Sequence, residues 1–168
     1  MRRYAGLKLN DIANGTGVSV SIYLQGCPHK CKGCHNPETW DKNGGMEYTD
    51  KVLEKILSSI NRNGVKRNFC VLGGEPLVDY NLDLTYEIVS TVKANFFNTK
   101  IYLWTGYTLE EIVNNEKVMR VLEYVDVLID GRFEESKKDL NLKFAGSTNH
   151  RVLDLKYFFE KNEIKILT

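Results

Sequence analysis

The sequence has almost no excess charge of either sign. Its 23 lysine and arginine residues balance 22 aspartate and glutamate residues, which gives a formal net charge of +1. Proteins that bind nucleic acids or anionic membranes usually carry a clear basic excess, and this composition gives no support for either partner. We therefore expect no nucleic acid and no membrane among the binding partners.

The sequence also lacks a long apolar run. No stretch approaches the roughly 18 apolar residues that a membrane-spanning helix needs, and no apolar segment follows Arg2 and Arg3 as it would in a signal peptide. We therefore expect a cytoplasmic protein. The length of 168 residues predicts one domain over residues 1–168.

Cysteine is scarce, but three of the 4 cysteines lie in one short stretch: Cys27, Cys31 and Cys34, with C-x3-C-x2-C spacing. Thiolates select iron–sulfur clusters, zinc or copper(I). A cubane iron–sulfur cluster usually takes four cysteines, so three would leave one iron without a protein ligand. Such an iron can bind a substrate or a cofactor. We therefore predict a [4Fe-4S] cluster held by these three cysteines.

A structural zinc site is the alternative, with a fourth ligand from His29, His35 or Cys70. Such sites usually pair two ligands on one knuckle with two on a second, and the sequence has no second knuckle. Cys70 lies inside the apolar run 69–72, which favours a buried core thiol. Disulfides are not expected in a cytoplasmic protein.

The apolar pattern predicts an α/β fold in which strands alternate with amphipathic helices. The last strand, at 163–167, is expected after a short helix around Tyr157 and Phe158. Helices are predicted from Thr49 or Asp50 to Asn63-Gly64, at about 80–95, and from Thr108 through Leu122. The other predicted strands are 4–9, 18–24, 69–72, 101–104, 125–129 and 151–155.

The chain is too short for a closed barrel, because an eight-stranded (βα) barrel takes about 250 residues. The sequence instead predicts an incomplete, open (βα) barrel of roughly five or six mostly parallel strands. Segment 131–150 is polar and without periodicity, so we expect an irregular loop over the sheet edge, too polar to form a dry lid.

Four motifs follow four successive predicted strands: the cysteines, GGEP at 73–76, WTG at 104–106 and DGRF at 130–133. Ligands in parallel α/β sheets bind at the carboxyl ends of the strands, so the four motifs are expected on one rim. Taken singly, GGEP and Asp130-Gly131 are also ordinary turn sequences.

The cysteine spacing followed by GGEP resembles radical S-adenosylmethionine enzymes. CPHKCKGCHNPETW at 27–40 resembles the cluster loop of the activating enzymes of glycyl-radical proteins. The likeness extends over NGTGVSVSIYLQGC, WTG, DGRF and GSTNHRVLDL, and is greatest to the group that activates anaerobic ribonucleoside-triphosphate reductase. Gly33 replaces the aromatic residue that the broader superfamily usually has there, which removes one expected adenine contact.

The resemblance implies a radical S-adenosylmethionine oxidoreductase with two cofactors, a [4Fe-4S] cluster and S-adenosylmethionine. Reductive cleavage of S-adenosylmethionine would yield a radical that removes hydrogen from a glycine of the reductase large subunit. A flavodoxin-like protein would donate the electron. No catalytic side chain is implied beyond the ligands, which are Cys27, Cys31 and Cys34 for metal, and Gly73, Gly74, Glu75, Pro76, Thr105 and Asp130 for the cofactor.

Within this reading, Gly73 and Gly74 would let backbone approach the cofactor, and Glu75 would bring a carboxylate near it. A side chain at Gly74 would then weaken cofactor binding and spare the iron. Trp104 is either a cofactor contact or a core residue, and residues 149–151 either touch a partner or form a solvated loop.

Three rival functions remain. A pyruvate formate-lyase-type activase has a similar loop, but those proteins are usually longer. A radical enzyme acting on a small molecule would need a further substrate-binding segment, and none is visible. An iron–sulfur electron carrier would normally use a fourth cysteine and would not need GGEP.

Overall fold

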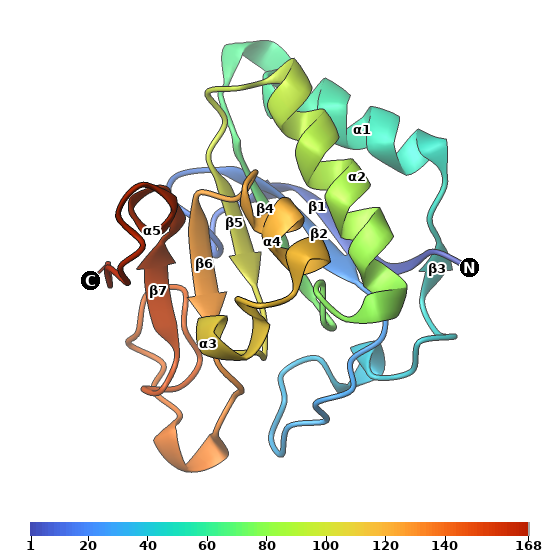
Figure 1. Ribbon diagram of the computed structural model, residues 1–168. Coiled ribbons are helices and arrows are strands. Elements are labelled where there is room, and N and C mark those ends of the chain that lie inside the picture. Colours follow the sequence, from blue (N-terminus) through green and yellow to red (C-terminus); the bar gives the residue numbers. More distant parts are fainter. Residues whose placement is uncertain (168) are drawn as a thin grey trace.

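A computed structural model describes residues 1–167 and shows a mixed sheet with the strand order β3-β1-β2-β4-β5-β6-β7 (Figure 1). The strands β2, β4, β5 and β6 run parallel, while β1, β3 and β7 pair antiparallel. Their bounds are Arg3–Asp11 (β1), Ser19–Leu24 (β2), Met46–Glu47 (β3), Asn68–Gly73 (β4), Ile101–Trp104 (β5), Val127–Asp130 (β6) and Arg151–Asp154 (β7). The sheet ends at β3 and β7 and does not close into a barrel.

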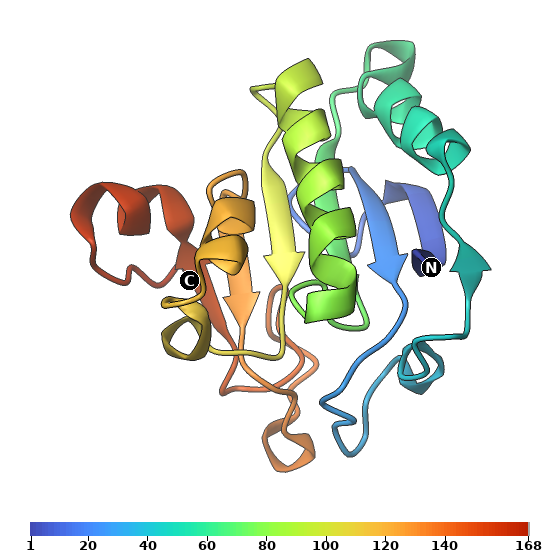
Figure 2. The same ribbon diagram turned by 45° about the vertical axis from the view of Figure 1, so that its right-hand side comes forward.

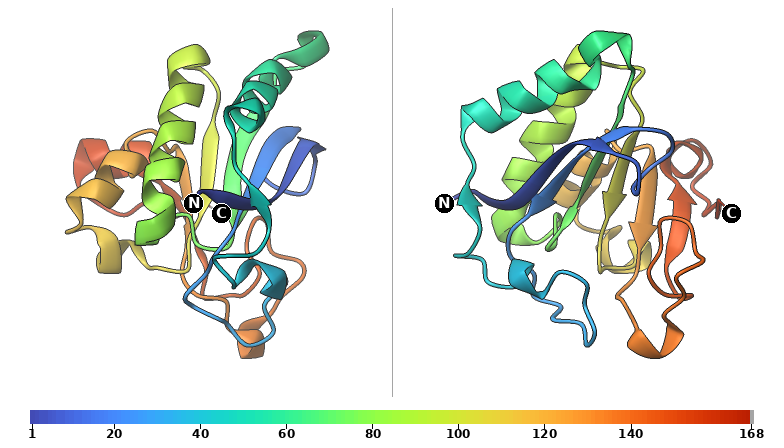
Figure 3. Two further views of the ribbon diagram at one scale, coloured as in Figure 1. Left: turned by 90° about the vertical axis from the view of Figure 1, so that its right-hand side faces the viewer. Right: turned by 180° about the vertical axis from the view of Figure 1, so that it is seen from behind.

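The helices cover one face of this sheet and leave the other to loops. Seen from behind in Figure 3, the central strands lie in front of the two long helices. The helices are α1 (Asp50–Ile60), α2 (Asp79–Asn95), α3 (Leu109–Ile112), α4 (Glu116–Leu122) and α5 (Leu155–Lys161), with 3-10 turns at Pro37–Thr39, Arg62–Gly64 and Glu135–Lys137. Among the helices within residues 1–167, none has both the length and the apolar character needed to cross a membrane.

Alternate residues of the strands build two apolar clusters on opposite faces. In β4, Phe69 and Val71 join the large core beneath the helices, whereas Cys70 and Leu72 join a smaller cluster on the other face. This alternation follows from the two-residue period of a strand. The smaller cluster is completed by Phe144 from segment 131–150. The face of the sheet opposite the helices is therefore covered by a loop.

The sequence-based prediction of an α/β fold with an unclosed sheet agrees with the structure, but details differ. The sheet has seven strands rather than five or six, because β1, β3 and β7 extend it with antiparallel pairs. The short strand β3 was not predicted. In place of a strand at 163–167, a single antiparallel bridge joins Leu153 to Ile166.

The helix predicted from Thr108 through Leu122 is two helices. The Thr108 side chain caps α3 and shares a capping box with Glu111. The Asn115 side chain then accepts hydrogen bonds from two backbone N–H groups at the start of α4. Asn is a favoured N-cap residue, so a new helix starts at Asn115. The apolar periodicity continues across this break and therefore does not reveal it. Val113, which follows α3, is exposed although it fits the apolar period of the predicted helix.

Candidate functional site

A cavity of about 440 Å³ lies at the carboxyl ends of the parallel strands. The cysteine loop, residues 26–40, and segment 131–150 both lie at this end of the sheet in Figure 2. The structure thus brings six of the predicted site residues to one cavity: Cys27, Cys31, Cys34, Gly73, Gly74 and Thr105. Glu75, Pro76 and Asp130 do not line it.

The cysteine loop has a compact backbone anchored at both ends. Gly26 donates a backbone hydrogen bond to Thr39 at 2.7 Å, which closes the base of the loop. Within the loop, Lys30 and Gly33 have positive φ values of 48° and 76°, so the backbone turns sharply at both residues. All three thiols are partly exposed and none is in a disulfide. The loop therefore offers three accessible soft ligands.

The chemistry of the three thiols fits an iron–sulfur cluster. Within residues 1–167, no three His, Cys, Asp or Glu side chains converge closely enough to hold one metal ion. In a cubane each cysteine binds a different iron, so its ligands need not meet at one point. Three thiols around an open cavity thus match the donor set of a [4Fe-4S] cluster with one iron left for another ligand.

Two of the loop thiols, those of Cys27 and Cys31, have a raised pKa and stay protonated in the free protein. Burial raises the pKa of Cys27 to about 11, and the charge of Glu75 adds to the rise, although the N–H groups of His29 and Lys30 oppose it. Burial likewise raises the pKa of Cys31. Metal binding must therefore displace protons from these thiols.

Cys70 is separated from this site. Its side chain is completely buried on β4, and burial raises its pKa to about 12. It does not line the cavity. The sequence-based expectation of a buried core thiol is confirmed.

The GGEP turn, residues 73–76, packs directly against the start of the cysteine loop. Gly74 N–H donates to Leu24 O at 2.9 Å, and Glu75 N–H donates to Gly26 O at 2.8 Å. Gly73 has φ of 105°, and a Cβ there would lie 2.6 Å from Leu24 N. A Cβ on Gly74 would lie only 2.3 Å from Gly26 O. The two glycines thus allow one backbone to approach another, in addition to any role toward a cofactor.

The Glu75 carboxylate is fully buried and its oxygens are occupied by protein groups. One oxygen accepts from Leu77 N–H at 2.9 Å and from Thr105 Oγ1 at 2.8 Å. The other accepts from Gly106 N–H at 2.7 Å and lies 2.7 Å from His29 Nε2. The carboxylate therefore links the GGEP turn, the WTG turn and the cysteine loop. Because Glu75 does not line the cavity, it would act on a cationic ligand only at a distance and not by direct contact.

Pro76 and Asp130 likewise serve the framework. The Pro76 carbonyl accepts a hydrogen bond from Thr85 Oγ1 at 2.7 Å. Asp130 is completely buried, accepts from Leu109 N–H at 2.8 Å, and pairs with Arg151 Nη2 at 2.6 Å. Asp130 does not line the cavity, so these contacts serve the framework.

Replacing Arg151 by methionine is expected to destabilise the protein strongly, because it leaves the buried Asp130 carboxylate without its cation. Arg151 keeps 27% of its side chain exposed, so we expect about 3 kcal/mol, the lower end of the cost of breaking a buried pair. Denaturant unfolding measures this loss. Lys165→Met, which breaks the exposed Lys165–Asp154 pair, is the control and should cost less than about 1 kcal/mol. Equal losses in both variants would contradict the assignment.

Several cavity residues were not assigned by the sequence. Trp104 and His35 line the cavity, and Trp104 Nε1 donates to the Phe144 carbonyl at 2.6 Å. Segment 131–150 is irregular as predicted, but it is not simply polar. Its apolar residues face the cavity, and Leu140 is 82% exposed at its edge. The apolar wall residues are Phe133, Leu140, Leu142, Phe144 and Ala145.

His29 is the most important residue of the site that the sequence did not assign to it. The sequence suggested it only as a fourth zinc ligand, whereas the structure places its ring nitrogen against Glu75. Its position between the first two cysteines was the available signal. The contact itself joins residues that are far apart in the chain, so local pattern could not reveal it.

Known proteins similar to this chain show its protein class. Residues 13–153 match a family described as a 4Fe-4S single cluster domain. The chain is also 37% identical over 140 residues to the anaerobic ribonucleoside-triphosphate reductase-activating protein of Vibrio cholerae serotype O1, covering 83% of this chain and 89% of the relative.

Two further relatives carry the same name. The chain is 35% identical over 147 residues to the protein of Escherichia coli K12, covering 87% of this chain and 94% of that one. It is 37% identical over 142 residues to the protein of Enterobacteria phage T4, covering 84% and 87%. The chain belongs to the family of anaerobic ribonucleoside-triphosphate reductase-activating proteins. The resemblance seen in the sequence is confirmed.

Proposed function

We propose that this chain is a radical S-adenosylmethionine enzyme that generates a glycyl radical on the large subunit of an anaerobic ribonucleotide reductase. One observation carries the proposal: the three loop cysteines share a cavity with Gly73, Gly74 and Thr105 at the carboxyl ends of parallel strands. The names of the relatives support the choice of reductase as the partner.

The two cofactors would divide this cavity between them. Cys27, Cys31 and Cys34 would hold the cluster, and the GGEP turn would receive the methionine end of S-adenosylmethionine. When bound, the cluster would pass one electron, received from a low-potential donor such as a flavodoxin, to S-adenosylmethionine, whose reductive cleavage would give methionine and a 5′-deoxyadenosyl radical. The protein residues orient the two groups and exclude water from them. In this proposal the unclosed sheet would be an incomplete radical S-adenosylmethionine barrel.

The unclosed sheet also favours a macromolecular substrate. A radical must be shielded while it reacts, and a sheet that does not close into a barrel does not enclose the site by itself. A glycine-bearing loop of the reductase would complete the enclosure. The exposed Leu140 at the cavity edge is suited to such a contact, because a solvent-exposed leucine gains from burial.

Cleavage of S-adenosylmethionine by the isolated protein is accordingly expected to be slow, and to become coupled to radical formation when the reductase is added. The measurement is electron paramagnetic resonance after anaerobic mixing of reconstituted protein, reductant, S-adenosylmethionine and reductase. A glycyl-radical doublet on the reductase is the expected result. Consumption of a small molecule while the reductase stays radical-free would refute the proposal.

A further inference from the structure

The His29 ring is enclosed between the cysteine loop and the rest of the rim. Only 5% of its side chain is exposed. The ring packs edge-on against Tyr107, with 4.6 Å between ring centroids. It also fills the space above Gly106, where a Cβ would lie 2.3 Å from its Cδ2 atom. The absence of a side chain at position 106 is therefore what admits the ring to this position.

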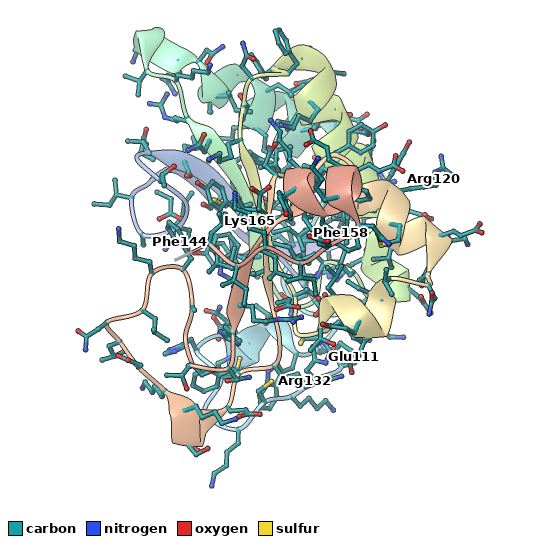
Figure 4. The ribbon with its side chains drawn as sticks, turned by 60° about the vertical axis from the view of Figure 1, so that its left-hand side comes forward. Glu111, Arg120, Arg132, Phe144, Phe158 and Lys165 are labelled. Carbon is teal, nitrogen blue, oxygen red and sulfur yellow. The ribbon has the colours of Figure 1, made fainter. Side chains whose placement is uncertain are left out.

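The hydrogen bonds of His29 define which ring nitrogen carries the proton. Arg132 Nε lies 3.2 Å from His29 Nδ1, and a guanidinium can only donate. His29 Nδ1 must accept, so the hydrogen is on Nε2 and is donated to Glu75 over 2.7 Å. Arg132 is itself held by Glu111 at 3.2 Å, and Figure 4 shows these two side chains close together.

This contact ties the two halves of the proposed cofactor site together. His29 lies between Cys27 and Cys31, and Glu75 lies in the GGEP turn directly after Gly73 and Gly74. The buried carboxylate receives its His29 bond in addition to those from the strand ends. A cofactor that spans from a loop-bound iron to the GGEP turn requires a fixed separation between them, and the His29–Glu75 bond constrains that separation.

We propose that His29 is a positioning residue, which holds the cysteine loop at the distance from the GGEP turn that S-adenosylmethionine binding requires. This inference rests on the proposed function. It assigns His29 no contact with iron or cofactor, and it differs from simple core packing because it depends on the donated hydrogen bond. An apolar side chain of similar size would satisfy packing but not positioning.

The test compares His29→Leu with His29→Gln in the anaerobically reconstituted protein. Iron content, S-adenosylmethionine affinity and the paramagnetic resonance spectrum of the reduced cluster, with and without S-adenosylmethionine, are measured for each. We expect both variants to keep the wild-type iron content. His29→Leu should bind the cofactor about tenfold more weakly or worse, because a buried charged acceptor loses its donor. His29→Gln, which keeps an N–H donor, should stay within about threefold of wild type.

The spectrum separates positioning from packing. In His29→Leu the cofactor-induced change in the cluster signal should be altered in shape, whereas His29→Gln should restore it. Wild-type affinity and spectrum in His29→Leu would overturn the inference. Loss of iron in both variants would also overturn it, since His29 would then be needed for the cluster itself. If wild-type protein shows no response to S-adenosylmethionine, the proposed function fails first, and that outcome is distinct.

A second variant avoids changes in the protein interior. Arg132→Gln removes the donor to Nδ1 from an exposed side chain, so the folded state should be preserved. We expect cofactor affinity to fall about threefold, as for a partly exposed hydrogen bond. Arg120→Gln is the matched control, because Arg120 is also exposed and lies on α4 well away from Arg132 in Figure 4. Equal effects of the two substitutions would contradict the role of Arg132 in fixing His29.

Discussion

Replacing any one of Cys27, Cys31 and Cys34 by alanine is expected to abolish the cluster, whereas Cys70→Ala should leave about four irons per chain, the content of a cubane. The loop supplies three thiols and no fourth cysteine lines the cavity. Loss of one thiol would leave two irons without protein ligands. Iron analysis and visible absorption after anaerobic reconstitution measure the result.

Cys70→Ala is the matched control because it also removes one thiol from the same protein. Its side chain is buried in the smaller apolar cluster, so a modest loss of stability is expected without loss of iron. If Cys70→Ala removed the cluster while one loop cysteine proved dispensable, the ligand assignment would be wrong.

Gly74→Ala is expected to impair both iron and S-adenosylmethionine binding. The added Cβ would lie 2.3 Å from Gly26 O, and this neighbour is backbone that leads directly into the cysteine loop. Relief of the clash must separate the GGEP turn from the loop, and overpacking of this kind costs about 1–3 kcal/mol. Denaturant unfolding, iron content and cofactor affinity should all fall relative to wild type.

Gly6→Ala is the control for this change. A Cβ at Gly6, on β1, meets no atom within 4 Å, so stability and iron content should be nearly unchanged. The sequence alone predicts that a side chain at Gly74 weakens cofactor binding and spares the iron. The contact with Gly26 changes that prediction to a joint loss, and normal iron content in Gly74→Ala would restore the simpler view.

The parts of this fold that the sequence predicted are those that local chemistry specifies. Strand β2 and helix α1 were predicted because their apolar residues repeat at periods of two and of about 3.6. The cysteine ligands were predicted because three thiols on one loop need no distant partner. Boundaries failed where a single capping residue decides, as at Asn115, because periodicity does not detect a break between two helices of similar phase.

The contacts within the rim were decided by the tertiary structure alone. His29 and Glu75 are 46 residues apart, and Gly74 meets Gly26 only because β2 and β4 pair in parallel with Leu24 opposite Gly73. That register is fixed because both strands must bury their apolar faces at the same time. The sequence of one strand alone does not contain this information. The sequence by itself therefore predicted the cysteine ligands and the rim motifs. The packing of the strands determined which residues line the cavity and which, like Glu75 and Asp130, hold the frame.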